Sequence, residues 1–311
     1  MPRPQPRAWP RAFPAAGRRG RRRGRSVTST TLHYLSDPVL RALYLPGVVA
    51  GLALASLCAM LSVLVVLKRL AFVGQGVSHA AFGGVGLVVA LGIGAGASAA
   101  GTLGQFGVIF LFCLGAAVLV GVLAERGKTE ADTAIGIVLV GSMALGAVLL
   151  RKAPRGVSWE SFLFGDILSL SWADAALAWG IALGVGMLLV VVRRPLLFWA
   201  FDPVVARAAG VRCGVMNFLL MSMLALATVT AMKLAGVVLA TALLVLPGAV
   251  ALKLSARWER VLLASACVAG AGVLGGLVLS FEANWPPGAS MVCVLAGFFG
   301  VAAIWAMIRR A

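Results

Sequence analysis

The chain has 311 residues, of which 61% are apolar and only 12% are Asp, Glu, Lys or Arg, and its mean hydropathy is +1.01. Soluble domains are about 45–50% apolar and about 25% charged, so this composition excludes a conventional water-soluble enzyme and a disordered regulator. Because one spanning helix uses about 20 residues, the apolar part predicts roughly eight to ten membrane spans. We therefore expect an all-α, polytopic membrane protein.

The net charge of +17 is concentrated near the N-terminus, where nine of the 27 basic residues are arginines within the first 25 positions. This stretch lacks an apolar core and is not a signal peptide. Its bias towards Arg, Pro, Gly and Ala is typical of translated GC-rich upstream DNA. That origin is favoured over a basic arm for anionic lipid or nucleic acid. We divide the chain into this Pro/Arg-rich tail with an interfacial segment, 1–45, and a transmembrane domain, 46–311.

Apolar runs predict nine candidate spans in the transmembrane domain. They are 46–67, 72–93, 105–124, 133–150, 172–192, 213–232, 234–252, 261–281 and 289–308. Only Lys233 separates the sixth and seventh runs, which leaves open that one of them is a short or broken helix. The segment 158–171 is too polar and too short to cross, and it predicts a re-entrant or surface element.

Basic residues in alternate loops indicate the orientation, because cytoplasmic loops carry an excess of Lys and Arg. Thirteen basic residues belong to one set of loops: Lys68, Arg69, Arg126, Lys128, Arg193, Arg194, Arg207, Arg212, Lys253, Arg257, Arg260, Arg309 and Arg310. Five belong to the other: Arg41, Arg151, Lys152, Arg155 and Lys233. The first set is expected to be cytoplasmic. The Arg-rich tail then lies on the opposite side, which favours its absence from the mature protein over a tail that loops back or a span count that is off by one.

Two polar side chains in the second run are candidates for a site. Gln75 and His79 are four residues apart in FVGQGVSHAAFGGVGL, so both project from one face of a helix. Polar residues inside a membrane are functional candidates, and the alternative is a histidine that donates to a backbone carbonyl across a helix interface. No carboxylate pair lies at the centre of a predicted span, which argues against a proton-driven carrier built on intramembrane acids.

The longest basic loop, 193–212, contains a helix-start pattern. In FDPVVARAAGVR, Asp202 can cap a helix, Pro203 can take its first position and Gly210 can end it. From the residues alone, an ordinary interfacial helix remains an alternative to a docking element.

Five blocks stand in a characteristic order: LKRLAFVGQGVSHAAFGGVG (67–86), DTAIGIVLVGSMALG (132–146), FLFGDILSLS (162–171), FDPVVARAAGV (201–211) and MKLAGVVLATALLVLPGAVA (232–251). A sixth, at 287–288 before the last span, matches more loosely. Together the blocks cover most of 46–308. In them the chain resembles the integral-membrane permeases of zinc/manganese/iron-type ABC importers, the metal ABC transporter permease family.

The resemblance implies a type II-like ABC importer permease with about eight or nine spans, a multi-pass protein of the bacterial inner membrane. Such a chain is a transport subunit and not an enzyme. It forms the pathway for a divalent transition metal, with zinc expected first, then manganese or iron, and it holds no stably bound cofactor. The implied partners are a cytoplasmic ATPase dimer that uses ATP, an extracytoplasmic metal-binding protein, a second permease copy in a homodimer, and membrane lipid. No nucleic acid is expected.

The resemblance also assigns roles to residues. His79 and Gln75 match the family's metal positions, although the family has an acidic residue where Gln75 stands, in GDxxSHA. Gln keeps an oxygen donor but loses the charge, so metal affinity or preference should differ. The segment after the fifth span resembles the coupling helix that docks into the ATPase, and its candidate residues are Asp202, Pro203, Ala206 and Gly210.

Two other classes of protein remain open on the sequence. An ATP-independent cation channel or secondary carrier would need no coupling helix and would work without partners. A membrane-embedded structural or assembly subunit would use His79 only for packing. Neighbouring genes for an ATPase and a metal-binding lipoprotein would favour the importer.

Overall fold

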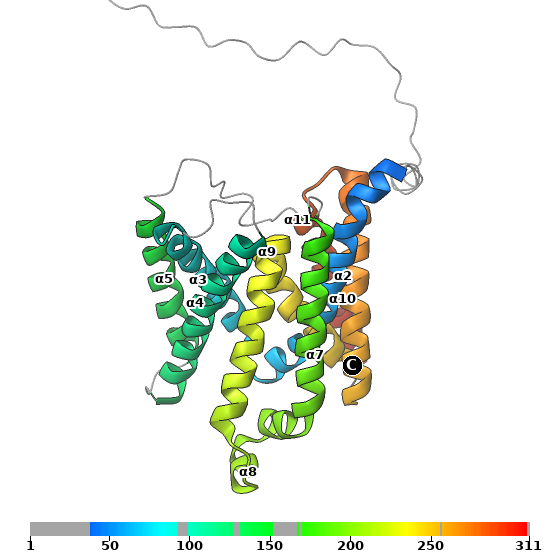
Figure 1. Ribbon diagram of the computed structural model, residues 1–311. Helices are drawn as coiled ribbons and strands as arrows, with labels where there is room; N and C mark the ends of the chain where they lie inside the picture. The colour runs from blue at the N-terminus through cyan, green and yellow to red at the C-terminus, as the bar shows by residue number, and fades with distance from the viewer. Residues whose placement is uncertain are drawn as a thin grey trace, which may run out of the picture.

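The computed structural model describes residues 38–92, 99–126, 131–151, 167, 170–255 and 257–309, and the secondary structure in these ranges is helical (Figure 1). The helices are α2 (Pro38–Leu67), α3 (Ala71–Ala90), α4 (Ala99–Arg126), α5 (Ala131–Leu150), α7 (Trp172–Phe201), α8 (Pro203–Ala208), α9 (Cys213–Leu254), α10 (Trp258–Ala283) and α11 (Pro287–Ile308). Eight of them are long and apolar enough to cross a membrane, which confirms the all-α, polytopic prediction. The tail up to residue 37 and most of 158–171 lie outside the described residues.

Several helices extend beyond the apolar runs that predicted them. α2 begins at Pro38, ahead of the apolar run at 46, and α7 continues through Pro195 to Phe201. At 1.5 Å per residue, the 30 residues of α7 span about 45 Å, whereas the hydrocarbon core is about 30 Å thick. α7 therefore projects out of the membrane. Outside the hydrocarbon core, charged residues such as Arg193 can be part of the helix without the cost of burying a charge in lipid.

The sixth and seventh predicted spans form one helical element, α9, that reverses at Gly236. This glycine has φ 81° and ψ 167°, a conformation open essentially to Gly alone. The first leg, 213–235, rises from α8 to Lys233, which contacts Asp174 at the start of α7. The second leg, 237–254, returns, because Leu254 leads directly into the start of α10. The two apolar runs thus form one element that breaks at Gly236, and each leg is long enough to cross, so neither run is a short helix.

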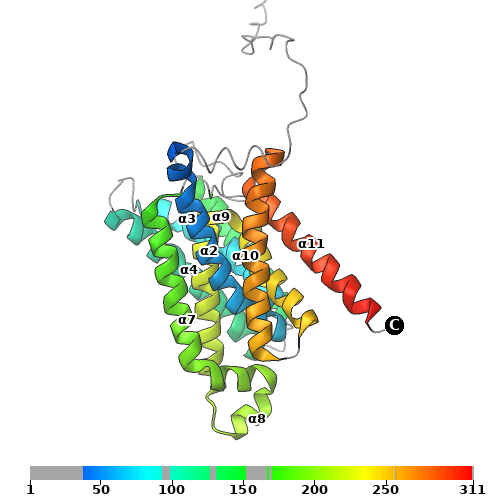
Figure 2. The ribbon, with the colours of Figure 1, turned by 90° about the vertical axis from the view of Figure 1, so that its right-hand side faces the viewer.

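The reversal places the start of α2 and the end of α11 at opposite ends of the bundle (Figure 1). Most basic residues of the described ranges lie towards the end that carries α8: at or just after the C-terminal ends of α2, α4, α7, α9 and α11, in α8, and at the start of α10. By the positive-inside rule this end is cytoplasmic. Figure 2 shows α7 and α10 on either side of α2, with α8 below them.

α3 and α5 run parallel and approach each other so closely at several glycines that a larger residue there would clash. A Cβ added at Gly83 would lie 2.8 Å from the Ser142 carbonyl oxygen, and one at Gly86 would lie 3.0 Å from the Gly146 Cα. Small residues permit this approach in lipid, where dispersion contacts replace the hydrophobic effect between helices. The two helices thus interlock through backbone contacts at these glycines.

A second tight contact joins α2 to α9 and α10. A Cβ at Gly248 would lie 2.5 Å from the backbone of Ser62, so α9 touches α2 directly. On the same part of α2, Ser265 donates a 2.8 Å hydrogen bond to the Ala59 carbonyl and lies 3.1 Å from the Ser62 hydroxyl. These buried hydroxyls satisfy one another, which fixes α10 on α2 without a charge in the membrane.

Candidate functional site

One strip of α3 remains accessible in the otherwise enclosed helix. α3 packs mainly against α4, α5 and α9, and most of its residues are buried. The exceptions at helical spacing are Phe72 and Gln75, which are exposed, and His79, which is half-buried. The structure thus places Gln75 and His79 on one face, as their spacing predicted. His79 is the ninth residue of a 20-residue helix and therefore lies near its midpoint.

Local packing fixes the backbone that carries these two side chains. Ser78 donates a 2.8 Å hydrogen bond to the Gly74 carbonyl, so its polar group is satisfied within α3. The buried Cys113 thiol of α4 lies 3.6 Å from the Val77 carbonyl. The side chains beside His79 are therefore committed to packing, and only Gln75 and His79 present donor atoms on the open strip.

The two side chains by themselves are too few to hold a metal ion stably. Within the described ranges, no three His, Cys, Asp or Glu residues gather closely enough to hold a metal ion. A neutral imidazole and an amide oxygen suit divalent transition metals, but stable sites use four or more ligands. One chain by itself therefore offers at most two such donors on α3.

The loop after α7 forms the short helix that the sequence predicted. The Asp202 carboxylate accepts hydrogen bonds from the Val204 and Val205 amides at 2.9 and 3.0 Å, and Pro203 occupies the first turn. The helix ends at Ala208, after which Gly210 takes a φ of 85°. The Val211 amide then donates to the Ala206 carbonyl at 3.0 Å, which closes the turn.

α8 protrudes at the cytoplasmic end of the bundle and rests on α7 and α9 (Figure 1). Ala206 is fully buried under it, whereas Val204 is 79% exposed and Val205 is half-exposed. The apolar side chains that α8 exposes therefore include these two valines, beside the exposed Pro203, Arg207 and Ala208, and not Ala206. Sequence reasoning missed them because a six-residue helix has too short a pattern to indicate its buried face.

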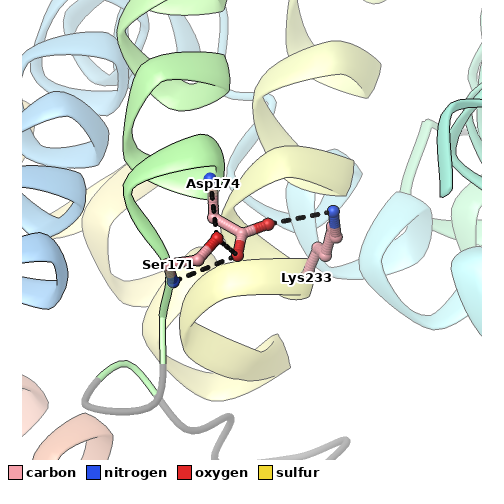
Figure 3. Close-up of polar contacts among 3 residues, drawn as sticks. All are labelled: Ser171, Asp174 and Lys233. Atoms are coloured by element: carbon pink, nitrogen blue, oxygen red, sulfur yellow. Dashed lines mark hydrogen bonds and ion pairs between the residues drawn. The ribbon is translucent and has the colours of Figure 1, made fainter. Parts of the chain in front are cut away.

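The opposite end carries a polar contact that sequence reasoning also missed. Asp174 accepts hydrogen bonds from the Ser171 hydroxyl at 2.7 Å and from the Ser171 amide at 3.2 Å, and Lys233 lies 3.3 Å from its other oxygen (Figure 3). The Ser171 hydroxyl also accepts from the Asp174 amide, so the two residues form a capping box for α7. This contact links the start of α7 to α9 beside its reversal, at the non-cytoplasmic end of the bundle.

α9 is the element that joins these parts. It packs against α3 and α4 along the bundle, against α8 at the cytoplasmic end, and against α7 through Lys233. The candidate metal pair and the candidate coupling segment do not meet. α9 is the structural route between them, since α8 has its main contacts with α7 and α9.

Comparison with known proteins identifies the family. Residues 41–306 match the model of the ABC 3 transport family. The chain is 33% identical over 275 residues to the manganese transport system membrane protein MntB of Synechocystis sp., covering 88% of this chain and 86% of that protein. It is 31% identical over 278 residues to a probable iron transport system membrane protein of Haemophilus influenzae, covering 89% and 98%.

The fold agrees with a solved structure. The structure of PsaBC from Streptococcus pneumoniae in complex with Fab aligns with a TM-score of 0.73 and 25% identity, over 89% of this chain and 95% of that chain. The family match covers most of the helical bundle. The chain is therefore a multi-pass protein of the bacterial inner membrane that belongs to the ABC 3 transport family, as the permease subunit of a metal ABC importer.

Proposed function

We propose that this permease carries a divalent transition metal past His79 and Gln75, with manganese or iron as the cargo. The observation that carries the proposal is the strip on α3, where a half-buried imidazole near the helix midpoint lies one turn from an exposed amide. Intramembrane polar residues are costly unless they serve transport or pairing. A weak site also suits transport, because the ion must leave as well as bind.

The similar proteins narrow the choice of transported metal. Those named above are manganese and iron systems, which favours these metals over the zinc expected first from the sequence. The donor chemistry agrees, because an amide oxygen is a hard ligand and imidazole is intermediate. Zinc remains a comparison in the test below.

A second copy of the permease would complete the site. One chain supplies two donors, and a pair of chains with their α3 strips turned towards each other would supply two imidazoles and two amide oxygens, enough for a four-ligand shell. The homodimer is thus part of the proposal, together with an ATPase pair under α8 and a metal-binding protein at the opposite face. The exposed valines of α8 are suited to dock into an apolar groove.

The test is metal uptake by a deletion strain that carries the parent chain, His79→Ala or Phe72→Ala. Phe72 shares the strip but offers no donor, so its variant controls for altered packing. We expect His79→Ala to lose manganese and iron uptake while its membrane level stays normal, and Phe72→Ala to retain uptake. Parental uptake of manganese, iron and zinc by His79→Ala would refute the pathway.

A second comparison separates an importer from a channel or carrier. Deleting the ATPase gene should abolish uptake if α8 couples transport to ATP. Uptake that persists without the ATPase would instead identify ATP-independent transport and would exclude the coupling role of α8.

A further inference from the structure

A groove opens between α7 and α10 on the cytoplasmic half of the bundle. Both helices pack against α2, and extensive contact between α7 and α10 themselves is lacking in the described part of the chain. Figure 2 shows α2 lying between them. The resulting cavity of about 400 Å³ has an apolar floor that includes Leu64 and Leu189, both buried.

Charged side chains line one end of this groove. Arg193 and Arg194 of α7 stand beside Trp258 and Glu259 of α10. No described carboxylate lies within 4 Å of either guanidinium, since the ion pair found in the described ranges is the one between Lys233 and Asp174. Two arginines and one glutamate leave the groove with a net positive charge.

The depth of the arginines matches a lipid headgroup. Arg193 lies 21 residues beyond Trp172, about 32 Å along α7 at 1.5 Å per residue, which is close to the thickness of the hydrocarbon core, about 30 Å. Trp258 stands at the same level, as tryptophans do at a membrane interface. The apolar floor therefore faces acyl chains, while the guanidinium groups face phosphates.

We propose that this groove is a binding site for an anionic phospholipid of the cytoplasmic leaflet. One acyl chain lies on Leu64 and Leu189 between α7 and α10, and the phosphate is held by Arg193 and Arg194. Arginine binds phosphate through two parallel hydrogen bonds, and basic pockets between spanning helices favour anionic headgroups. The lipid fills the space that α7 and α10 leave open and so joins the two helices. The site is independent of the metal pathway.

Native mass spectrometry of the full chain in mixed micelles tests whether the charges of Arg193 and Arg194 hold the lipid. Equal amounts of phosphatidylglycerol and phosphatidylcholine are offered to the parent, to the double variant R193Q/R194Q and to R260Q. Arg260 is exposed at the same end of α10 but does not line the groove. We expect the parent and R260Q to retain phosphatidylglycerol in about fivefold preference, the factor for one net charge near a membrane surface. R193Q/R194Q should lose it.

A second pair of variants tests the apolar part. Val190 lines the groove, whereas its neighbour Val191 does not, and both are exposed. Val190→Trp should reduce retained phosphatidylglycerol severalfold, and Val191→Trp should not. The proposal fails if the parent shows no preference, if R260Q loses it as fully as R193Q/R194Q, or if Val190→Trp has no effect. It also fails if millimolar inorganic phosphate displaces the lipid, which would indicate a simple anion site, or if Val190→Trp dissociates a dimer, which would indicate a second copy in the groove.

Discussion

The Lys233 ammonium lies 3.3 Å from the Asp174 carboxylate, which ties the start of α7 to α9 three residues before the chain reverses. The two side chains are 32% and 28% exposed, so the pair is screened and its contribution is about 0.2–1 kcal/mol. The same carboxylate also caps α7 through Ser171.

The cap and the ion pair can be separated by substitution. Ser171→Ala removes the hydroxyl that accepts from the Asp174 amide and should cost about 1 kcal/mol, as lost N-caps do. Lys233→Met removes only the pair and should cost less. Thermal unfolding in detergent, followed by size-exclusion chromatography, measures both. A larger loss for Lys233→Met would show that the pair dominates this end of the bundle.

The reversal of α9 depends on one glycine. Gly236→Ala would place a Cβ on a backbone with φ 81° and ψ 167°, at a cost of about 1–3 kcal/mol. We expect less monodisperse protein after heating and impaired uptake. Gly180→Ala is the control, because Gly180 lies in α7 with nothing within 4 Å of the added Cβ. Equal stability of the two variants would contradict this account.

The exposed face of α8 can be tested through its valine. Val204→Asp puts a charge on the outward face and should release the ATPase from the purified permease without loss of the permease itself. Ile308→Asp is the control, since Ile308 is exposed at the cytoplasmic end of α11. Ala206→Arg is a poorer probe, because Ala206 is buried and its replacement would displace α8. If the ATPase co-purifies normally with Val204→Asp, then Val204 and the exposed face of α8 do not contribute to binding the ATPase.

Gly210 allows a test of backbone conformation alone. Its φ is 85°, and an added Cβ would meet nothing within 4 Å, so only the backbone disfavours a side chain. Asn tolerates this left-handed region better than a β-branched residue does. We expect Gly210→Asn to retain most ATP-dependent uptake and Gly210→Val to lose most of it. Similar uptake by the two variants would show that the turn is not required.

Restoring the acidic residue at position 75 should strengthen metal binding. Gln75→Asp replaces a neutral oxygen donor by a charged one on the same strip as His79, and carboxylates bind Mn²⁺ more strongly than amides. The half-saturating manganese concentration for uptake should fall, and the maximal rate should fall with it if release becomes slow. Gln75→Asn is the neutral control. An unchanged half-saturating concentration would place Gln75 outside the metal path.

Hydropathy predicted the bundle well because the membrane imposes it. Spans such as those in α10 and α11 fall within a few residues of the apolar runs, since backbone groups in lipid must be paired within a helix. The helix ends were harder to predict. The fifth span was predicted to end at residue 192, before the basic loop, but α7 continues to Phe201, beyond the length needed to cross the hydrocarbon core.

The candidate site was only partly accessible to sequence reasoning. Helical spacing was enough to put Gln75 and His79 on one face, and capping chemistry was enough to predict α8. By contrast, Lys233 and Asp174 are 59 residues apart, and no local pattern joins them. The groove of Arg193 and Trp258 likewise depends on two helices packing on a third, which is a property of the tertiary fold.

The interlocked glycines of α3 and α5 limit how the proposed metal donors can move. Sliding or rolling one helix over the other would drive the backbone at Gly86 into Gly146, and Gly83 into Ser142, because backbone faces backbone at these points and aromatic side chains are packed closely around them. We therefore expect α3 and α5 to move together as a rigid pair that carries His79. Any cycle that turns His79 from one side of the membrane to the other must displace α5 by the same amount. The outer surface of α5 is largely exposed, and whatever contacts it in the membrane must then allow α5 to move.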